Sequence, residues 1–125
     1  MKITKPKLES PKLVAARASF VRTSPRKLRL VARAISGLTP DKAIAYLQAM
    51  NKRAAIPIAR VIKQALANAK NNFQISPGNL IFETVQILEG PRGAKRLDKG
   101  HGARFDRGLK RRRLAHILVK LKVKS

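Results

Sequence analysis

The sequence predicts an α+β fold, in which three helices pack on a small antiparallel sheet and a long extended β-hairpin arm projects from it. Three observations support this prediction. Apolar residues recur at helical spacing in three segments between residues 24 and 71. Two later segments alternate apolar and polar residues as strands do. The 25 residues between those two strands, 89–113, are too basic and too polar to form a core.

The chain begins with a basic segment and a short strand. A length of 125 residues fits one domain. Residues 1–14 mix Lys, Pro and Ser without periodicity, which predicts a basic N-terminal extension before a single domain over residues 15–125. Residues 15–23 alternate well enough for a strand, with Phe20 on one face and Val21 on the other.

The first helix is predicted over residues 24–37, with Ser24 as N-cap, Pro25 at the first position and Gly37 as the stop. It has an apolar side and a basic side. No Glu stands at helical spacing to pair the arginines, so phosphate contact is favoured over a solvated charged face. The apolar side is Leu28, Val31, Ala32 and Ile35, and the basic side is Arg26, Arg29 and Arg33.

Two further helices follow. The second begins at Pro40 after the N-cap Thr39. The third runs from about residue 52 to residue 71, but Pro57 conflicts with a continuous helix, so the helix either begins near Ile56 or is kinked there. The residues expected to face inward are Ile44 and Leu47 in the second helix, and Ala55, Ile58, Ile62, Ala65, Leu66 and Ala69 in the third.

The last two strands are predicted at residues 80–88 and 114–124 and should pair antiparallel. In the earlier strand, the alternation places Phe82 and Thr84 on one face and Ile81, Val85 and Ile87 on the other. The later strand should have one buried face and one basic face. Its apolar set is Ile117, Val119, Leu121 and Val123, alternating with Leu118, Lys120, Lys122 and Lys124.

The charge of the chain points to a polyanionic partner. With 29 Lys and Arg against 6 Asp and Glu, the formal net charge is +23, and self-repulsion at this charge opposes a compact state. A nucleic acid fits, because each cation that reaches a phosphate releases condensed counterions. A membrane surface is the rival. However, no stretch approaches the about 20 apolar residues of a spanning helix, and residues 1–16 lack the apolar region of a signal peptide. We therefore expect no membrane partner and a cytoplasmic location.

Catalytic and metal chemistry lack the necessary residues. Cysteine is absent, and the two histidines, His101 and His116, lie far apart without an acidic cluster, so we expect no metal site and no cofactor. The sequence contains no paired carboxylates, no nucleophile with its base and no phosphate-binding loop. We therefore predict no catalytic residue and no enzyme activity.

The basic segment is interpreted as an arm over about residues 88–114. Loops beyond about 12–15 residues usually mean function or disorder. Three interpretations stay open: a disordered surface loop, a nuclear-import or generic polyanion tag around LKRRR, and an extended arm that folds on RNA. If the flanking strands continue as a ribbon, the arm is on the order of 40 Å long. Its single aromatic residue, Phe105, could stack on a base, and Asp98, Asp106 and Glu89 would orient neighbouring arginines.

Several phrases of the sequence resemble a known family in the same order. They are ASFVRTSPRKLRLVARAISG, NKRAAIPIARVIKQALANAKNN, VQILEGPRGAKR and AHILVKL. Together they resemble the bacterial-type large-ribosomal-subunit protein twenty-two, across about residues 15–123. At the arm's tip the sequence departs from the family pattern, because LDKGHGARF stands where a Pro-Arg-Ala type of sequence is expected.

The resemblance implies a small α+β domain that binds large-subunit (23S-type) rRNA, supports assembly, and sends its hairpin along the peptide exit tunnel. It implies neighbouring large-subunit proteins and the nascent polypeptide as further partners. The residues expected to bind rRNA are Arg22, Ser24, Arg26, Lys27, Arg29, Arg33, Arg92, Lys95, Arg96, Lys99, Arg104, Arg107, Lys110, Arg111, Arg112 and Arg113. Those expected at the tunnel-proximal tip are Lys95, Arg96, Leu97, Gly100, His101, Gly102 and Arg104.

The resulting hypothesis is a structural rRNA-binding protein of the ribosome that is not an obligate homo-oligomer. The rival from another class is an architectural DNA-binding protein with a basic β-arm. Such arms generally carry apolar wedges at their tips and belong to obligate dimers, and this arm has no clear wedge. A stable dimer in solution would favour that rival.

Overall fold

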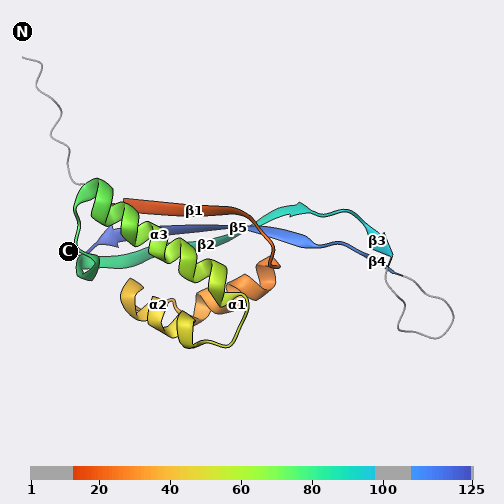
Figure 1. The fold of residues 1–125 in the computed structure, drawn as a ribbon, viewed down its shortest axis with the longest axis horizontal. Coiled ribbons are helices and arrows are strands. Elements are labelled where there is room, and N and C mark those ends of the chain that lie inside the picture. Colours follow the sequence, from red (N-terminus) through yellow and green to blue (C-terminus); the bar gives the residue numbers. More distant parts are fainter. Residues whose placement is uncertain (1–12, 98–107, 125) are drawn as a thin grey trace, which may run out of the picture.

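The computed structural model describes residues 13–97 and 108–124 as a layer of helices on one face of a sheet, with a ribbon that projects beyond both (Figure 1). The predicted α+β architecture with three helices is confirmed. The elements are β1 (Leu13–Val21), α1 (Pro25–Ala34), α2 (Pro40–Ala49), α3 (Ala55–Phe73), the short 3-10 helix η1 (Pro77–Asn79), β2 (Leu80–Arg92), β3 (Arg96–Leu97), β4 (Leu109–Lys110) and β5 (Arg113–Val123).

The main sheet has the order β1-β5-β2, and both neighbours run antiparallel to β5. The predicted pairing of the last two long strands is therefore confirmed, and β5 is the central strand. α3 packs on β1 and β5, while α1 packs on β2. The core lies between the helices and this face of the sheet. Its largest fully buried side chains include Leu28, Ile35, Ile58, Ile62 and Ile117.

The alternation predicted for β5 is confirmed over most of its length. Ile117, Val119 and Leu121 are fully buried on the helix-covered face. Val123, predicted to continue this buried set, is 37% exposed at the last position of the strand. Leu118 and Lys120 lie on the opposite face and are half-buried.

The faces predicted for β2 were wrong around Phe82, because the strand contains a β-bulge. Phe82 pairs with Leu121 and Thr84 pairs with Lys120, so Glu83 is an extra residue that β5 does not match. A bulge shifts the period-2 alternation by one residue. As a result Phe82 lies on the same face as Val85 and Ile87, and all three pack against the core. The Glu83 carboxylate lies 3.0 Å from the Lys122 ammonium group.

β1 begins earlier than predicted and also contains an irregularity. It starts at Leu13 rather than residue 15, and Val14 and Ala16 are buried under α3. The register shifts between Ala18 and Val21, which pair with Ile117 and Ala115, so two residues of β1 oppose His116 alone. Phe20 and Val21 point to opposite faces as predicted, with Phe20 exposed and Val21 packed against the core.

α1 and α2 begin where the sequence predicts, with Pro25 and Pro40 at their first positions. Ser24 and Thr39 occupy the N-cap positions, but neither side chain makes a capping hydrogen bond. α1 ends at Ala34, before the predicted stop at Gly37, and a short turn follows in which the Leu38 amide donates to the Ile35 carbonyl. The inward residues predicted for α1 are buried or packed against the core, and so are those predicted for α2.

The conflict at Pro57 is resolved by the start of α3. The helix begins at Ala55, so Pro57 lies in the first turn, where the backbone amides have no acceptor within the helix. The missing amide of Pro57 therefore costs no helical hydrogen bond. Every residue of the predicted stripe is buried except Leu66, which is partly buried against the core, and the structure adds Ala59 and Val61.

The arm is a two-stranded ribbon as far as the structure describes it. β2 continues to Arg92, which pairs with Arg113, and the Gly93 amide donates to the Arg112 carbonyl over 2.7 Å. β3 and β4 then pair Arg96 with Lys110 and Leu97 with Leu109. The predicted tip residues Gly100, His101, Gly102 and Arg104 lie outside the described residues, as does Phe105. Figure 1 shows the ribbon extending away from the helices.

Candidate nucleic-acid interface

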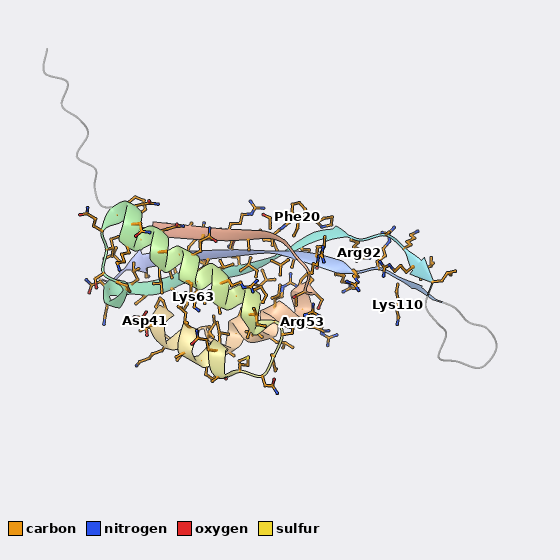
Figure 2. All side chains as sticks on the ribbon, viewed as in Figure 1. Phe20, Asp41, Arg53, Lys63, Arg92 and Lys110 are labelled. Carbon is orange, nitrogen blue, oxygen red and sulfur yellow. The ribbon has the colours of Figure 1, made fainter. Side chains whose placement is uncertain are left out.

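Cations from three parts of the chain meet where the arm leaves the domain. They line a groove of about 750 Å³, which we call the basic cradle. Figure 2 shows Arg53 at the helical end of this region, below the base of the ribbon. The cradle is lined by Arg22, Ser24, Lys27, Arg53, Gly93, Arg96, Arg111, Arg112, Arg113 and Leu114.

Local structure explains why these residues converge. Arg22 and Ser24 stand in the short connection between β1 and α1, and Lys27 follows in the first turn of α1. Burial of Pro25 and Leu28 fixes that end of the helix against the core, so the neighbouring polar residues point outward. Arg53 precedes α3 next to the buried Ala54. The remaining cations belong to the two strands of the ribbon.

The cradle contains seven cations and no acidic side chain. Across residues 13–97 and 108–124, no carboxylate forms an ion pair with any of these seven. Like charges brought this close repel one another, and water screens them only partly. The positive end of the α1 dipole lies at the same place. The arrangement therefore attracts an anion with several charges, and arginine side chains suit phosphate because they can donate two parallel hydrogen bonds.

Two smaller basic grooves extend the cradle. One, of about 370 Å³, adds Lys52 beside Lys27 and Arg53. The other, of about 280 Å³, lies along the ribbon and is lined by Arg92, Lys95, Leu109, Arg111 and Arg113. Arg111 and Arg113 line both this groove and the cradle, so the positive surface continues from the domain onto the arm.

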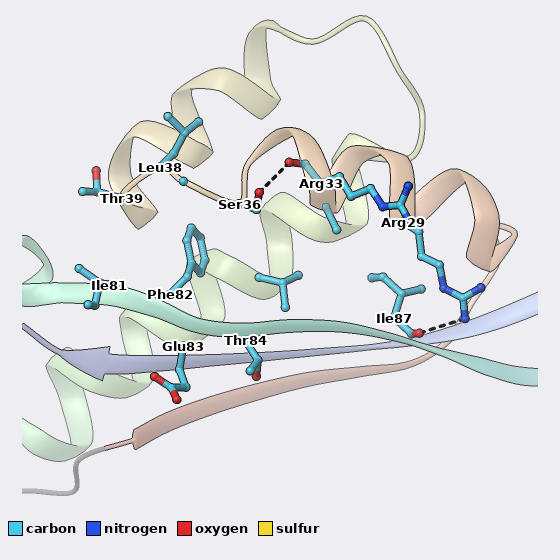
Figure 3. Close-up of a pocket in the computed structure, with 13 residues that line it drawn as sticks. Arg29, Arg33, Ser36, Leu38, Thr39, Ile81, Phe82, Glu83, Thr84 and Ile87 are labelled. Atoms are coloured by element: carbon cyan, nitrogen blue, oxygen red, sulfur yellow. Dashed lines mark hydrogen bonds between the residues drawn. The ribbon is translucent and has the colours of Figure 1, made fainter.

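The arginines on the outer side of α1 do not join the cradle. Arg29 and Arg33 line a separate groove of about 590 Å³ between α1 and β2, shown in Figure 3. The Arg29 guanidinium donates to the Ile87 carbonyl over 3.4 Å, so it links α1 to the edge strand β2. The Arg33 carbonyl accepts a hydrogen bond of 2.9 Å from the Ser36 hydroxyl. Arg29 therefore has a structural contact that the sequence did not predict.

The structure divides the predicted rRNA-binding residues into four groups. It unites Arg22, Ser24, Lys27, Arg96, Arg111, Arg112 and Arg113 in the cradle. Arg92, Lys95 and Lys110 lie farther along the ribbon, whereas Arg26, Arg29 and Arg33 are exposed on α1. Lys99, Arg104 and Arg107 lie outside the described residues, as do Gly100, His101 and Gly102, which were predicted for the tip alone.

Two residues of this surface, Lys52 and Arg53, were not predicted from the sequence. They precede α3 and belong to no periodic stripe, so the helical pattern gave no reason to select them. The available signal was a pair of adjacent cations directly before a helix start, a position that the connection between α2 and α3 leaves exposed.

Within the part of the chain that the structure describes, no three His, Cys, Asp or Glu side chains come together as a metal site would require. No helix in that part is long and apolar enough to cross a membrane.

The fold and the cradle define a class, a basic α+β domain with a projecting ribbon whose charges suit a polyanion. The family model for ribosomal protein L22p/L17e matches residues 16–122. Relatives named large ribosomal subunit protein uL22 align with most of the chain. That of Herpetosiphon aurantiacus is 43% identical over 98 residues, covering 78% of this chain and 84% of the relative. That of Rubrobacter xylanophilus is 40% identical over 104 residues, covering 83% and 80%. That of a Thermotoga species is 37% identical over 116 residues, covering 92% and 71%.

The chain belongs to the ribosomal protein L22p/L17e family. Members of this family are structural proteins of the large ribosomal subunit and not enzymes, which confirms the predicted family and the predicted lack of catalysis. The predicted cytoplasmic, ribosomal location agrees with this membership.

Proposed function

We propose that this protein binds large-subunit rRNA through the basic cradle and the arm, and so supports assembly of the subunit. The observation that carries the proposal is the convergence of seven cations, without a carboxylate partner among the described residues, at the junction of domain and ribbon. Backbone phosphates are the polyanion that such a surface fits in a ribosomal protein. Shape and charge, more than base sequence, would determine the binding site.

We further propose that the arm lines the polypeptide exit tunnel, with the nascent polypeptide and neighbouring large-subunit proteins as additional partners. Family membership supports this, and so does the exposure of the ribbon. Leu97 and Leu109, which pair across β3 and β4, are 68% and 62% exposed. Neither side chain contributes to the core, so the ribbon is available to external contacts. We also propose that the protein enters the ribosome as a single copy and is not an obligate homo-oligomer.

Crosslinking in cells tests both parts. A photoreactive residue replaces Lys95 on the ribbon, and a matched variant carries it at Lys42, an exposed position on α2 that lines none of the basic grooves. We expect the Lys95 variant to crosslink to large-subunit rRNA and to nascent polypeptide, and the Lys42 variant to give neither at a comparable level. Recovery of scattered RNA or duplex DNA from Lys95, without large-subunit enrichment, would overturn the proposal.

A further inference from the structure

One face of the main sheet is left open by the helices. Side chains of β5 alternate, so His116, Leu118 and Lys120 point away from the buried set and onto this open face. Strand pairing gives their neighbours. Arg17 of β1 lies opposite Leu118, and Leu88 of β2 lies opposite His116. The open face therefore carries apolar, aromatic and cationic side chains together.

Phe20 stands at the end of β1 on this face in an unusual conformation. Its φ angle is +57°, in the left-handed region that side chains other than glycine rarely adopt. Such a conformation costs on the order of 1 kcal/mol or more, so surrounding contacts must hold it. Its amide donates to the His116 Nδ1 atom over 3.1 Å, and the two rings meet edge to face at 5.1 Å and 84°. Despite these restraints, Phe20 is 61% exposed.

The exposed ring belongs to a row that crosses the sheet. Phe20 on β1, His116 on β5 and Leu88 on β2 are neighbours, and Leu88 is 41% exposed. We call these three residues the ring platform. The amide hydrogen bond holds the Phe20 backbone, and the edge-to-face contact with His116 restrains its ring before any partner binds, so less side-chain freedom is left to lose on binding. An exposed apolar surface that is held rigid at a backbone cost is better explained by binding than by stability.

Charge indicates what binds there. Arg17 and Lys120 lie on the same open face, and neither has a carboxylate partner within the described residues. Arg22, two residues after Phe20, lines the basic cradle. The platform is thus next to cations along the sheet and beside the groove proposed for phosphate binding. A planar group attached to a phosphate chain satisfies both features, whereas an apolar protein segment would leave the cations unsatisfied.

We propose that the ring platform binds the base of an unpaired RNA nucleotide, stacked on the exposed side chain of Phe20. His116 is a positioning residue, because its Nδ1 atom accepts a hydrogen bond from the Phe20 amide and its ring contacts the Phe20 ring edge to face. The inference rests on the proposed function in taking RNA as the partner, but it adds a site that contributes stacking rather than charge. Fully paired RNA offers no free base face and should not occupy it.

Fluorescence provides a direct test, because the chain contains no Trp. A Phe20→Trp variant of the full-length protein is titrated with deproteinised large-subunit rRNA, with a 12-nucleotide single-stranded RNA and with a fully paired RNA duplex. The matched control is Tyr46→Trp, at a 47% exposed aromatic position on α2. We expect both single-stranded RNA and rRNA to quench indole emission in Phe20→Trp, duplex RNA to leave it unchanged at saturation, and the control to respond to none.

Affinity provides an independent test. Stacking is worth roughly 1–3 kcal/mol per base, so Phe20→Leu should weaken single-stranded RNA binding roughly 5- to 150-fold. Because no charge is removed, the slope of log affinity against log salt concentration should stay the same. Tyr46→Leu should change neither quantity. Circular dichroism verifies that Phe20→Leu is folded.

The outcomes separate this inference from the proposed function. Quenching by single-stranded RNA without preference for large-subunit rRNA would support the platform and overturn the proposed rRNA specificity. Tight, selective rRNA binding with unchanged indole emission in Phe20→Trp would support the proposed function and overturn the platform. If RNA left the indole emission of Phe20→Trp unchanged and an apolar peptide quenched it, the platform would be assigned to a protein partner and the inference would also be overturned.

Discussion

At the residue scale, Arg53 adds charge to the cradle from a position that contributes nothing to the core. It is exposed, and no carboxylate among residues 13–97 and 108–124 pairs with it. Arg53→Ala should leave the free energy of unfolding within about 0.5 kcal/mol of the parent. The slope of log RNA affinity against log salt concentration should fall by about 0.9, the loss of one phosphate contact. Binding titrations at several salt concentrations measure this change.

Lys42→Ala is the matched control for Arg53, because Lys42 is an exposed cation on α2 that lines none of the basic grooves. Its removal should leave the salt slope unchanged. An equal change in the two variants would mean that affinity follows net charge alone, and the cradle would then not be a site.

Substitution of Arg29 should lower stability more than substitution of Arg26, although both side chains are exposed on α1. Arg29 donates to the Ile87 carbonyl, so Arg29→Ala should lower the free energy of unfolding by about 0.5–1 kcal/mol. Arg26 has no such hydrogen bond in the described part of the chain, so Arg26→Ala should have no measurable effect. Urea denaturation compares the two variants. Equal stability in both would show that the contact between α1 and β2 contributes nothing.

These residues also show how far the sequence could predict the site. The family resemblance selected Arg22 and Lys27, and the run of basic residues selected the arm cations. Helical spacing selected Arg26, Arg29 and Arg33, none of which lines the cradle. The sequence could not show that Arg53 meets the other cradle cations, because that meeting depends on how α3 packs. Nor could the sequence show that Arg29, unlike Arg26, makes a structural hydrogen bond, because the acceptor, the Ile87 carbonyl, is distant in sequence.

At the element scale, Gly90 allows the two strands of the ribbon to approach each other. A Cβ atom at this position would lie 2.9 Å from both the carbonyl carbon and the carbonyl oxygen of Leu114. Backbone atoms of a paired strand cannot move aside without breaking the ladder. Gly90→Ala should therefore cost about 1–3 kcal/mol of stability, measured by thermal or urea denaturation. A variant as stable as the parent would contradict this packing.

Gly78 is the matched control for Gly90, because a Cβ atom there would have no neighbour within 4 Å. Gly78→Ala should leave stability unchanged or raise it slightly through a less flexible unfolded chain. A loss in Gly78→Ala as large as in Gly90→Ala would show that glycine flexibility, rather than strand approach, causes the effect.

Elements were predicted well where one pattern continued without interruption. The starts of α1 and α2 and the buried face of β5 follow from capping residues and alternation. The prediction for β2 was wrong at Phe82, on the other side of the bulge from Val85 and Ile87, because a bulge depends on the pairing with the partner strand and cannot be recognised from the alternation alone. The order β1-β5-β2 likewise comes from packing between distant segments.

At the scale of the whole molecule, the arm and the domain should be separable. No side chain in residues 91–97 or 108–113 is buried. Replacing residues 91–113 by an Asn-Gly turn should keep the free energy of unfolding within about 1 kcal/mol. Affinity for large-subunit rRNA should fall by at least about tenfold, because most cradle cations are removed. Calorimetry and binding titrations check the two parts, and a large loss of stability would show that the arm supports the fold.

The central position of β5 has a consequence for how the protein is made. β1 and β2 do not pair with each other, and each requires β5, which follows both in the chain. During synthesis β1 emerges early, but it cannot pair with β5 until residues 113–123 have left the ribosome. Pairing between such distant segments slows folding. Until then the apolar sides of α1 and α3 lack the sheet that buries them, so release of β5 is the event that lets the whole domain form at once.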